Sequence, residues 1–405
     1  MRKIMMLTRN FPPMMTEGSV RSYRFAMALQ ESGWEPLVIG PELPAGTGVI
    51  PRFDFTVRYA GNGVEGDGEG LEGVDLFRAL RREPVSGLDR LSRKLQAEQG
   101  GRSWEKQARQ IATECMEEHG DIAALYAQAP PYDTVRLALE LSRRYGLPLL
   151  PDQLWPCGGG SCRKDEELLI KAHHGLVVPT RYAKETLLKK YHGKVGHGDI
   201  SVVPGLSGCS GVATGKRDHT GLRLLFLVAG GQPRGFTKVF SLLLGALGSV
   251  LKDGERMMFA GPRSHEAAGV AVKAGNADAV DFPGGGTMED ELNACARADL
   301  CCMVLADPLP SAGYFPERLV DVLSCCMPVI AALPRGYDAK GPLDAGVLRV
   351  GNDDPGSFRD AVEQQLKIAR GQRLVIPGRE TEGADCCKQD ASLLLRELMA
   401  RLPPA

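Results

Sequence analysis

The chain has 405 residues, more than one ordinary domain needs and enough for two of about 150 to 200 residues each. Its 49 Lys and Arg against 50 Asp and Glu leave a formal net charge of −1, so no general positive field draws it to nucleic acid, and any anion site must be local. With 43% hydrophobic and 24% charged residues it has the composition of a folded soluble protein, and no apolar run reaches the roughly 20 residues of a membrane span.

The first half of the chain alternates short apolar strands with amphipathic helices. The opening run over residues 3–8 predicts a buried strand rather than a secretion signal, because Arg9, Asn10 and two prolines end it early. We therefore expect a cytoplasmic protein, with peripheral contact at the inner face of the membrane left open. Further strands are predicted at 36–40, 54–61, 121–127, 147–151, 175–180 and 200–205, and helices at 19–33, 73–119, 133–145, 166–172 and 181–191.

The same alternation restarts after a small, polar, glycine-rich stretch. That stretch, 206–221, predicts a linker between an N-terminal domain over 1–205 and a C-terminal domain over 222–383. A last segment, 384–405, is expected to be helical and to pack back on the N-terminal domain. Between 222 and 383 the predicted strands are 222–230, 256–261, 278–284, 300–306, 328–332 and 346–351, and the predicted helices are 237–251, 265–275, 289–298, 316–326 and 355–369.

This pattern predicts an α/β fold of two doubly wound, Rossmann-like domains facing a central cleft. Near-continuous apolar strands alternating with helices are typical of a parallel sheet that is covered on both faces. Such sheets bind ligands outside the carboxyl ends of their strands, so the default site lies between the domains.

The 11 cysteines predict buried thiols rather than a metal centre. No Cys-x-x-Cys pair occurs, and three pairs are adjacent in the chain, where neighbouring side chains of a strand point to opposite faces. Cys157 and Cys162, which flank a glycine loop, are the strongest metal candidates, but no histidine or third cysteine lies near them in the sequence. We expect no metal and no cofactor, and mostly reduced cysteines.

The first segment whose residues could bind a ligand is the loop over residues 10–21. Gly18 and Ser19 stand at the start of a predicted helix, where free N–H groups and the helix dipole suit a diphosphate or an acceptor hydroxyl. The loop lacks the G-x-G-x-x-G pattern, which disfavours a nicotinamide or flavin cofactor. An ordinary helix start capped by Ser19 is the equal alternative.

The second segment, 230–238, places Arg234 and Lys238 at the start of the next domain's first helix, with Thr237 as the expected cap. Cations are unfavourable at a helix N-terminus unless a bound anion neutralises them. A pyrophosphate leaving group needs such positive charges when no metal ion supplies them. Two solvated surface cations are the alternative interpretation.

The third segment, 308–321, carries Glu317 and Asp321 on one face of a predicted helix, with Arg318 between them. There the carboxylates could bind ribose or sugar hydroxyls while the arginine meets phosphate. Pro and Glu are also ordinary residues of a helix start.

Four sets of stretches follow one another along most of the chain: FPPMMTEGSVRSYRFAMALQESGWEPLVIG, then APPYDTVRLALELSRRYGLPLLPDQLW, then GLVVPTRYAKETLLKKY with ISVVPG, and last VDFPGGGTMEDELNACARADLCCMVL with FPERLVDVLSCCMPVIAA. In this order they resemble the retaining glycosyltransferases of family 4, which have the two-domain GT-B architecture.

The resemblance implies transfer of a hexosyl or N-acetylhexosaminyl group from a nucleotide-diphosphate sugar, with retention of configuration and without a metal. Arg234 and Lys238 would hold the diphosphate and stabilise its departing charge, and Asp321 would take the place of the glutamate that binds ribose. The implied donor site comprises Gly18, Ser19, Gly284, Gly285, Gly313, Tyr314, Glu317, Arg318 and Asp321, and the acceptor side comprises Glu17, Arg21 and Asp152.

The sequence also departs from the family pattern. The first of the two family glutamates is replaced by Gly313, although Pro316 and Arg318 resemble a proline–basic pattern found in one branch. Two alternatives therefore stay open: a degenerate GT-B scaffold that binds a nucleotide or a partner, and, less favoured, a sugar-nucleotide 2-epimerase.

The acceptor is unidentified, whether glycan, lipid-linked or small molecule. Residues 76–115 are basic and partly amphipathic, which suits either peripheral membrane contact or a solvated helical insertion.

Overall fold

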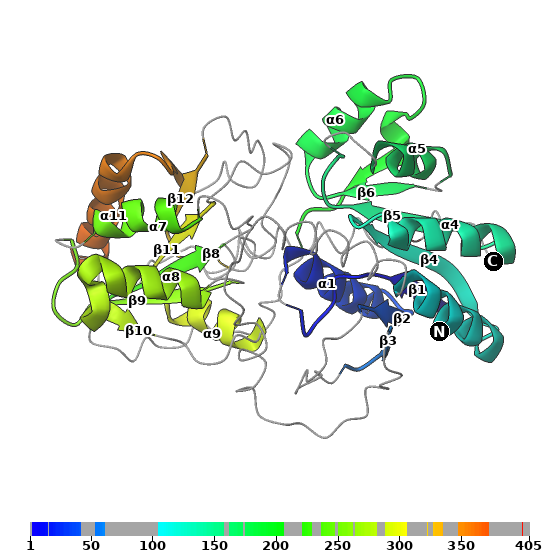
Figure 1. Cartoon of the computed structure of the whole chain (residues 1–405), viewed down its shortest axis with the longest axis horizontal. Coiled ribbons are helices and arrows are strands. Elements are labelled where there is room, and N and C mark those ends of the chain that lie inside the picture. The colour runs from blue at the N-terminus through cyan, green and yellow to red at the C-terminus, as the bar shows by residue number, and fades with distance from the viewer. Residues whose placement is uncertain are drawn as a thin grey trace, which may run out of the picture.

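The fold is seen in a computed structural model of the whole chain (Figure 1). The structure describes residues 2–14, 16–41, 53–60, 104–157, 162–172, 175–205, 221–228, 236–247, 250–261, 264–281, 288–305, 322, 327–334, 347–371 and 399.

The first sheet is parallel, and its strand order reverses at the centre. Among the described residues the order is β3-β2-β1-β4-β5-β6-β7. The chain starts at β1, builds outwards on one side, and then returns to add β4 on the other, so β1 and β4 flank the topological switch point. The elements are β1 (Arg2–Leu7), α1 (Glu17–Glu31), β2 (Trp34–Gly40), β3 (Thr56–Tyr59), a helix over residues 104–118, β4 (Ile122–Ala129), α4 (Asp133–Tyr145), β5 (Leu149–Gln153), α5 (Cys162–Ala172), β6 (Leu176–Val178), α6 (Arg181–Lys190) and β7 (Ile200–Val202).

The second sheet repeats this plan. Its described strands are also all parallel, in the order β10-β9-β8-β11-β12-β13, with the switch point between β8 and β11. The elements are β8 (Arg223–Val228), α7 (Phe236–Gly245), β9 (Arg256–Ala260), α8 (Ser264–Ala271), β10 (Val280–Asp281), α9 (Met288–Arg297), β11 (Leu300–Val304), β12 (Val329–Leu333), β13 (Val347–Gly351) and α11 (Pro355–Gly371). A π turn, Val272–Asn276, and a 3-10 turn, Ala277–Ala279, follow α8.

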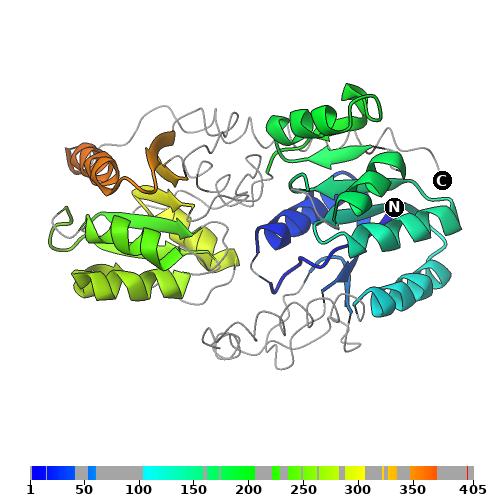
Figure 2. The ribbon, with the colours of Figure 1, turned by 45° about the horizontal axis from the view of Figure 1, so that its top comes forward.

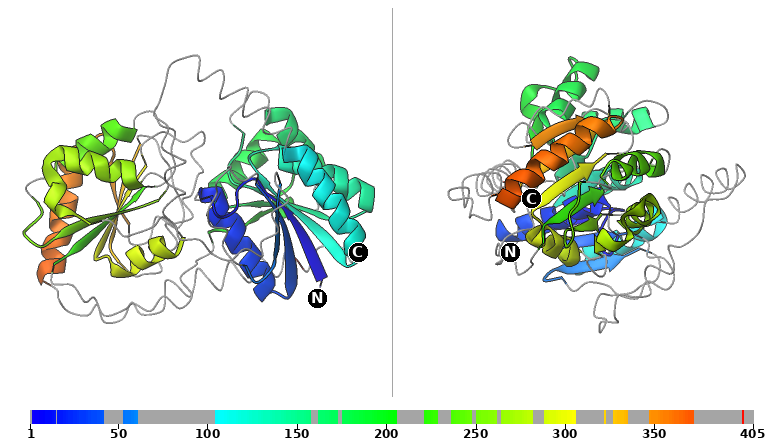
Figure 3. Two further views of the ribbon diagram at one scale, coloured as in Figure 1. Left: turned by 60° about the horizontal axis from the view of Figure 1, so that its bottom comes forward. Right: turned by 90° about the vertical axis from the view of Figure 1, so that its left-hand side faces the viewer.

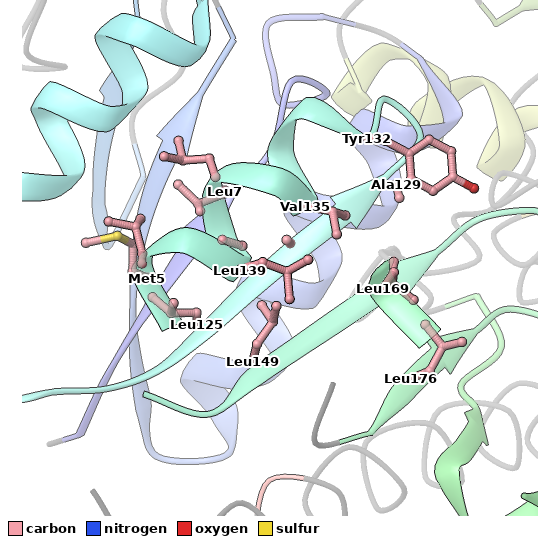
Figure 4. Close-up of a cluster of buried hydrophobic side chains, with 14 of the residues drawn as sticks. Met5, Leu7, Leu125, Ala129, Tyr132, Val135, Leu139, Leu149, Leu169 and Leu176 are labelled. Carbon is pink, nitrogen blue, oxygen red and sulfur yellow. The ribbon is translucent and has the colours of Figure 1, made fainter. Parts of the chain in front are cut away.

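Each sheet is covered on both faces, because alternate side chains of a strand enter different cores. In β1, Met5 and Leu7 pack with α4, α5, α6 and the helix over 104–118, and Figure 4 shows part of this core. Ile4 and Met6 point the other way and pack with α1. Burial on both sides explains why the strand is apolar at successive positions.

The second domain has the same two-faced construction. Leu224 and Phe226 of β8 pack with α7, α8 and α11, whereas Leu225 and Leu227 pack with α9. Figures 1 and 3 show α7, α8 and α11 gathered on one side of this sheet and α9 on the other. The two domains lie side by side, with α1 and α9 on the sides that face one another (Figures 1 and 2).

The predicted fold class is confirmed, and most predicted elements occur within a few residues of their expected positions. The helix expected over 237–251 ends at Gly245, in keeping with the low helix propensity of glycine. The helix expected over 265–275 changes to a π turn at Val272, and Gly275 there has φ +88°. Of the strand expected over 278–284, Val280–Asp281 is a strand, and residues 282–284 lie outside the described residues.

Several expectations fall partly or wholly outside the described residues. In the helical region predicted over 73–119 the structure describes 104–119, with a helix over 104–118. Trp104 is buried at its start, and its Nε1 donates to the Gly40 carbonyl at 2.8 Å. Of the predicted helix 316–326 only Val322 is described, and of the predicted linker only Gly221. The domain boundaries at 205, 221 and 383 stay predictions.

The cysteines agree with the expectation at four positions and differ at one. Cys115, Cys295, Cys301 and Cys302 are buried free thiols, and burial raises the pKa of Cys115 to about 11. Cys157 is disulfide-bonded, which corrects the expectation of a reduced thiol there. No helix in the described part of the chain combines the length and apolar character needed to cross a membrane.

Candidate functional site

The candidate site lies where two of the singled-out loops leave their sheets. The β1–α1 loop starts at the switch point of the first sheet, and α7 follows β8 at the switch point of the second. In doubly wound sheets these are the positions at which the crossovers diverge and leave room for a ligand.

The start of α1 is capped by Thr16, and not by Ser19 as the alternative interpretation of this loop had it. The Thr16 Oγ1 accepts a hydrogen bond from the Ser19 N–H at 3.1 Å, and the two hydroxyl oxygens lie 2.8 Å apart. Ser19 is in the first turn and fully buried. One free N–H of the helix start is thus satisfied within the protein.

The Asn10 side chain leaves little room for a side chain at position 18, which explains the glycine there. A Cβ atom added at Gly18 would lie 2.9 Å from Asn10 Cγ, closer than real Cβ contacts, and 3.0 Å from Asn10 Nδ2, which is tighter than most. The missing side chain therefore makes room for an amide from the other end of the same loop. Contact of Gly18 with donor phosphates stays a prediction.

Gln128, at the carboxyl end of β4, ties this loop to the sheet. Its Oε1 accepts from Asn10 Nδ2 at 3.0 Å, and its Nε2 donates to the Gly18 carbonyl at 2.9 Å. Thr8, just after β1, lies 3.1 Å from the Ser22 hydroxyl of α1. Thr8 and Gln128 lie outside the segments selected from the sequence, and Asn10 lies in the selected loop without an assigned role. A buried polar residue at the end of an apolar strand is the signal that could have found Thr8 and Gln128.

Arg21 and Asp152, both expected on the acceptor side, form a buried ion pair with each other. The Arg21 Nε and Nη2 donate to the two Asp152 oxygens at 2.7 and 2.9 Å, and the side chains are 1% and 0% exposed. The Tyr126 hydroxyl donates to Asp152 at 2.7 Å, and burial together with the Asp152 charge raises the pKa of Tyr126 well above its usual value. Arg21 also donates to the Val203 carbonyl at 3.0 Å.

This geometry assigns the pair a positioning role: it joins α1 to β4, β5 and the segment after β7. Because neither side chain is accessible, contact with an acceptor would require the pair to open. Glu17, the third expected acceptor-side residue, is the first residue of α1 and is 8% exposed. Its carboxylate suits the positive end of the helix dipole, and its contact with an acceptor stays a prediction.

In the second domain, Lys238 is accessible. It lies exposed in the first turn of α7, and no ion pair joins it to any other described residue. Thr237 is inside that turn rather than capping it, and its hydroxyl lies 3.4 Å from Glu266 Oε1. An exposed cation at a helix N-terminus is an available partner for an anion.

The end of β9, beside β8, is built around Gly261. This residue has φ +105°, and a Cβ there would lie 2.2 Å from the Val228 carbonyl oxygen. Its N–H donates to Glu291 Oε1 of α9 at 3.1 Å. Gly261 and Glu291 were not among the site residues predicted from the sequence.

The other predicted donor residues lie outside the described residues: Arg234, Gly284, Gly285, Gly313, Tyr314, Glu317, Arg318 and Asp321. Their roles stay predictions. Within the described ranges, no three His, Cys, Asp or Glu side chains come together in a way that could hold a metal ion.

The carboxyl edge of the first sheet touches the second domain. Trp155 stands two residues after the end of β5, yet its side chain packs against the core between the second sheet and α9. The loops at this edge, including β1–α1, therefore lie on the side of the first sheet that faces the second domain.

No protein-family model matches the chain, and neither does any curated protein. Among solved structures, sucrose-phosphate synthase from Thermosynechococcus elongatus is similar with a TM-score of 0.62 and 14% identity, over 99% of both chains. UGT2 from Phytolacca americana, solved with UDP-2-fluoro-glucose and pterostilbene, is similar with a TM-score of 0.57 and 11% identity, also over 99% of both. A protein described as a UDP-N-acetylglucosamine 2-epimerase from Listeria monocytogenes has a TM-score of 0.52 and 10% identity, over 95% of this chain and 94% of its own.

Together with the two parallel sheets, these similarities establish the GT-B fold that the resemblance implied. At 10–14% identity they establish the fold alone, and membership of family 4 stays a prediction.

Proposed function

We propose that this protein transfers a sugar from a nucleotide-diphosphate sugar to an acceptor. The observation that carries the proposal is the position of Lys238: an exposed cation at the N-terminus of α7, beside the switch point of the second sheet. A diphosphate is the group that such a place attracts. The GT-B fold and a similar protein solved with a UDP-sugar derivative support the same substrate class.

In this proposal the second domain holds the donor. Arg234 and Lys238 bind the diphosphate and stabilise the charge that develops as the bond to the sugar breaks. Gly284 and Gly285 line the base pocket. The remaining donor contacts are assigned to Gly313, Tyr314, Glu317, Arg318 and Asp321, the last taking ribose.

The first domain supplies the acceptor side at Glu17, and Gly18 and Ser19 of the same turn contact the donor. Asn10 and Gln128 hold this turn in place, so its backbone is fixed before a ligand arrives. Fixed donors and dipoles need no reorganisation during the reaction, which is the basis of electrostatic catalysis. Transfer with retention of configuration, and a hexosyl or N-acetylhexosaminyl group, are part of the proposal.

The first experiment is a thermal-shift screen with UDP-, GDP- and ADP-sugars, because a ligand of the folded state raises the melting temperature. Release of nucleotide from the stabilising donor is then measured with and without candidate acceptors. Binding without release would favour the degenerate scaffold, and conversion of the donor at C2 without an acceptor would favour the epimerase.

The residue-level test replaces both Arg234 and Lys238 with alanine. Nucleotide release should fall by about 100-fold or more, as expected when transition-state charge loses its partners, while the melting temperature stays near that of the wild type. Lys273→Ala is the matched control, since Lys273 is also exposed but follows the far end of α8. Full activity of the double variant would exclude the assigned role.

A further inference from the structure

Trp155 belongs to the first domain by position and to the second by packing. It follows β5, whereas the core against which it packs is formed by one face of the second sheet and α9, including Leu227, Met303, Ala331 and Cys295. Among the described residues of that core and its surroundings, Trp155 is the one that comes from the first domain. Its indole is half-buried there.

The backbone that carries Trp155 is fastened to the first domain on both sides. The Leu154 N–H donates to the Ala129 carbonyl of β4 at 2.8 Å, and the Gln153 side chain donates to the Trp155 carbonyl at 3.3 Å. The Glu166 Oε1 of α5 accepts from Gln153 Nε2 at 2.5 Å and from the Cys157 N–H at 2.6 Å. The loop over 153–157 is therefore a rigid projection.

Glu166 is itself held firmly. It is fully buried, its Oε2 accepts from the Tyr191 hydroxyl at 2.6 Å, and it forms an ion pair with Lys190 at the end of α6. Burial and the nearby Glu166 carboxylate raise the pKa of Tyr191, which keeps the hydroxyl protonated as a donor. Burying charged groups carries a desolvation penalty, so a buried charged network at this loop suggests that the position of the loop is important.

From these contacts we infer that Trp155 is a positioning residue that holds the two domains in register across the sugar-transfer site. A fully buried aromatic side chain covers about 150–250 Å², so a half-buried indole still covers a sizeable part of an interface between domains of one chain, which is typically about 600–1,500 Å². A single anchor of this size can therefore set the separation of the donor and acceptor sides. The inference rests on the proposed function for the identity of the site, but not for the contact itself.

The first test measures the domain arrangement and needs no substrate. Small-angle X-ray scattering of the full chain should give a larger radius of gyration for Trp155→Ala than for the wild type, with an unchanged far-UV circular dichroism spectrum. Leu168→Ala, an exposed leucine of α5 in the same domain, is the control and should match the wild type. An unchanged radius for folded Trp155→Ala would overturn the inference whether or not the protein is an enzyme.

If Trp155→Ala does not fold, Trp155→Leu takes its place, with hydrogen exchange as the readout. Amides of α9 should then exchange faster than in the wild type, while those of α8, which packs on the opposite face of the sheet, should not change. Equal exchange of α9 in variant and wild type would contradict the inference.

The second test separates binding from turnover. UDP, GDP and ADP, each titrated alone, should bind Trp155→Ala as they bind the wild type, because the second domain holds the nucleotide. Turnover of the donor should fall by about 100-fold, as a misplacement of about 1 Å can cause, and Trp155→Phe should restore most of it. A wild type without turnover would refute the proposed function, while the scattering result would still decide the role of Trp155.

Discussion

At the scale of single residues, the β1–α1 turn is shaped by side chains that lie far from it in the chain. Gln128 reaches across from β4 to fix both Asn10 and Gly18. The same helix is fastened further along by the pair of Arg21 and Asp152. Both sets of contacts can be tested by double substitution, because each predicts that the effects of two substitutions on stability are not additive.

Gly18→Ala should destabilise the protein by about 1–3 kcal/mol, since the new Cβ overlaps the Asn10 amide and forces it away from Gln128. Urea unfolding measures the change. In the background of Asn10→Ala the same substitution has room for its methyl group, so the double variant should lose less than the sum of the two single losses, by about 0.5–3 kcal/mol. Strict additivity would show that the overlap is not the cause.

Replacing one member of the buried pair, as in Asp152→Leu, should cost about 3–5 kcal/mol, because it leaves the Arg21 guanidinium buried without its counter-ion. The double replacement Arg21→Met with Asp152→Leu should recover part of that loss. A double-mutant cycle in urea measures the coupling, and a double variant as unstable as the sum of the singles would refute the pairing.

At the scale of elements, α11 is fastened to the turn before β9 by one ion pair. The Arg370 guanidinium donates to both Glu255 oxygens at 2.7 Å, and the Lys252 N–H donates to the same carboxylate at 2.9 Å. Burial acts to raise the pKa of Glu255, but the Arg370 and Lys252 hydrogen bonds outweigh it, and the pKa is lowered from 4.5. The ionised carboxylate thus stabilises the folded state.

Because the folded-state pKa is the lower one, the stabilisation is present above pH 4.5 and is lost as the pH falls through the folded pKa. Glu255→Gln should therefore cost about 1–3 kcal/mol at pH 7, and the difference from the wild type should shrink below pH 4.5. Urea unfolding at pH 7 and below pH 4.5 measures both. Glu363→Gln, which removes an exposed i,i+4 pair with Lys367, is the control and should stay close to the wild type at both pH values. An equal difference in the free energy of unfolding between Glu255→Gln and the wild type at both pH values would refute the role of Glu255 ionisation.

At the scale of the whole molecule, each domain completes a core of the other. Trp155 reaches from the first domain to the second, and Met399, which follows the last described strand of the second domain by 48 positions (399 − 351), is buried in the first. Met399 is 3% exposed and packs in the core with Met6 and Phe25. Met399 is the described residue of the segment 384–405, and packing of the whole segment on the first domain stays a prediction.

Met399→Ala should therefore destabilise the first domain, by about 2–5 kcal/mol, although the residue comes after the second. Hydrogen exchange separates the domains: amides of β1 and β4 should lose protection more than those of β8 and β11. Met399→Leu, which keeps the volume, should cost less than about 1.5 kcal/mol. Equal loss of protection in both sheets would contradict this assignment.

The sequence by itself determined the elements and the fold class. Apolar runs such as LCCMVLA and helices such as 133–145 have a local periodicity, and the alternation of the two implies parallel sheets covered on both faces. It also placed Lys238 at a helix start, because that depends only on neighbours in the chain.

Tertiary structure alone decided which residues meet. Arg21 and Asp152 are 131 positions apart, and the family resemblance places both on the acceptor side, whereas nothing local in the sequence marks them as partners of each other. The contact of Gln128 with Asn10 and Gly18, and the packing of Trp155 and Met399 against the other domain, likewise depend on how strands pair and helices pack. Periodicity reports which face of an element is buried, whereas the partner on that face is fixed only when the register of the sheet brings distant segments together.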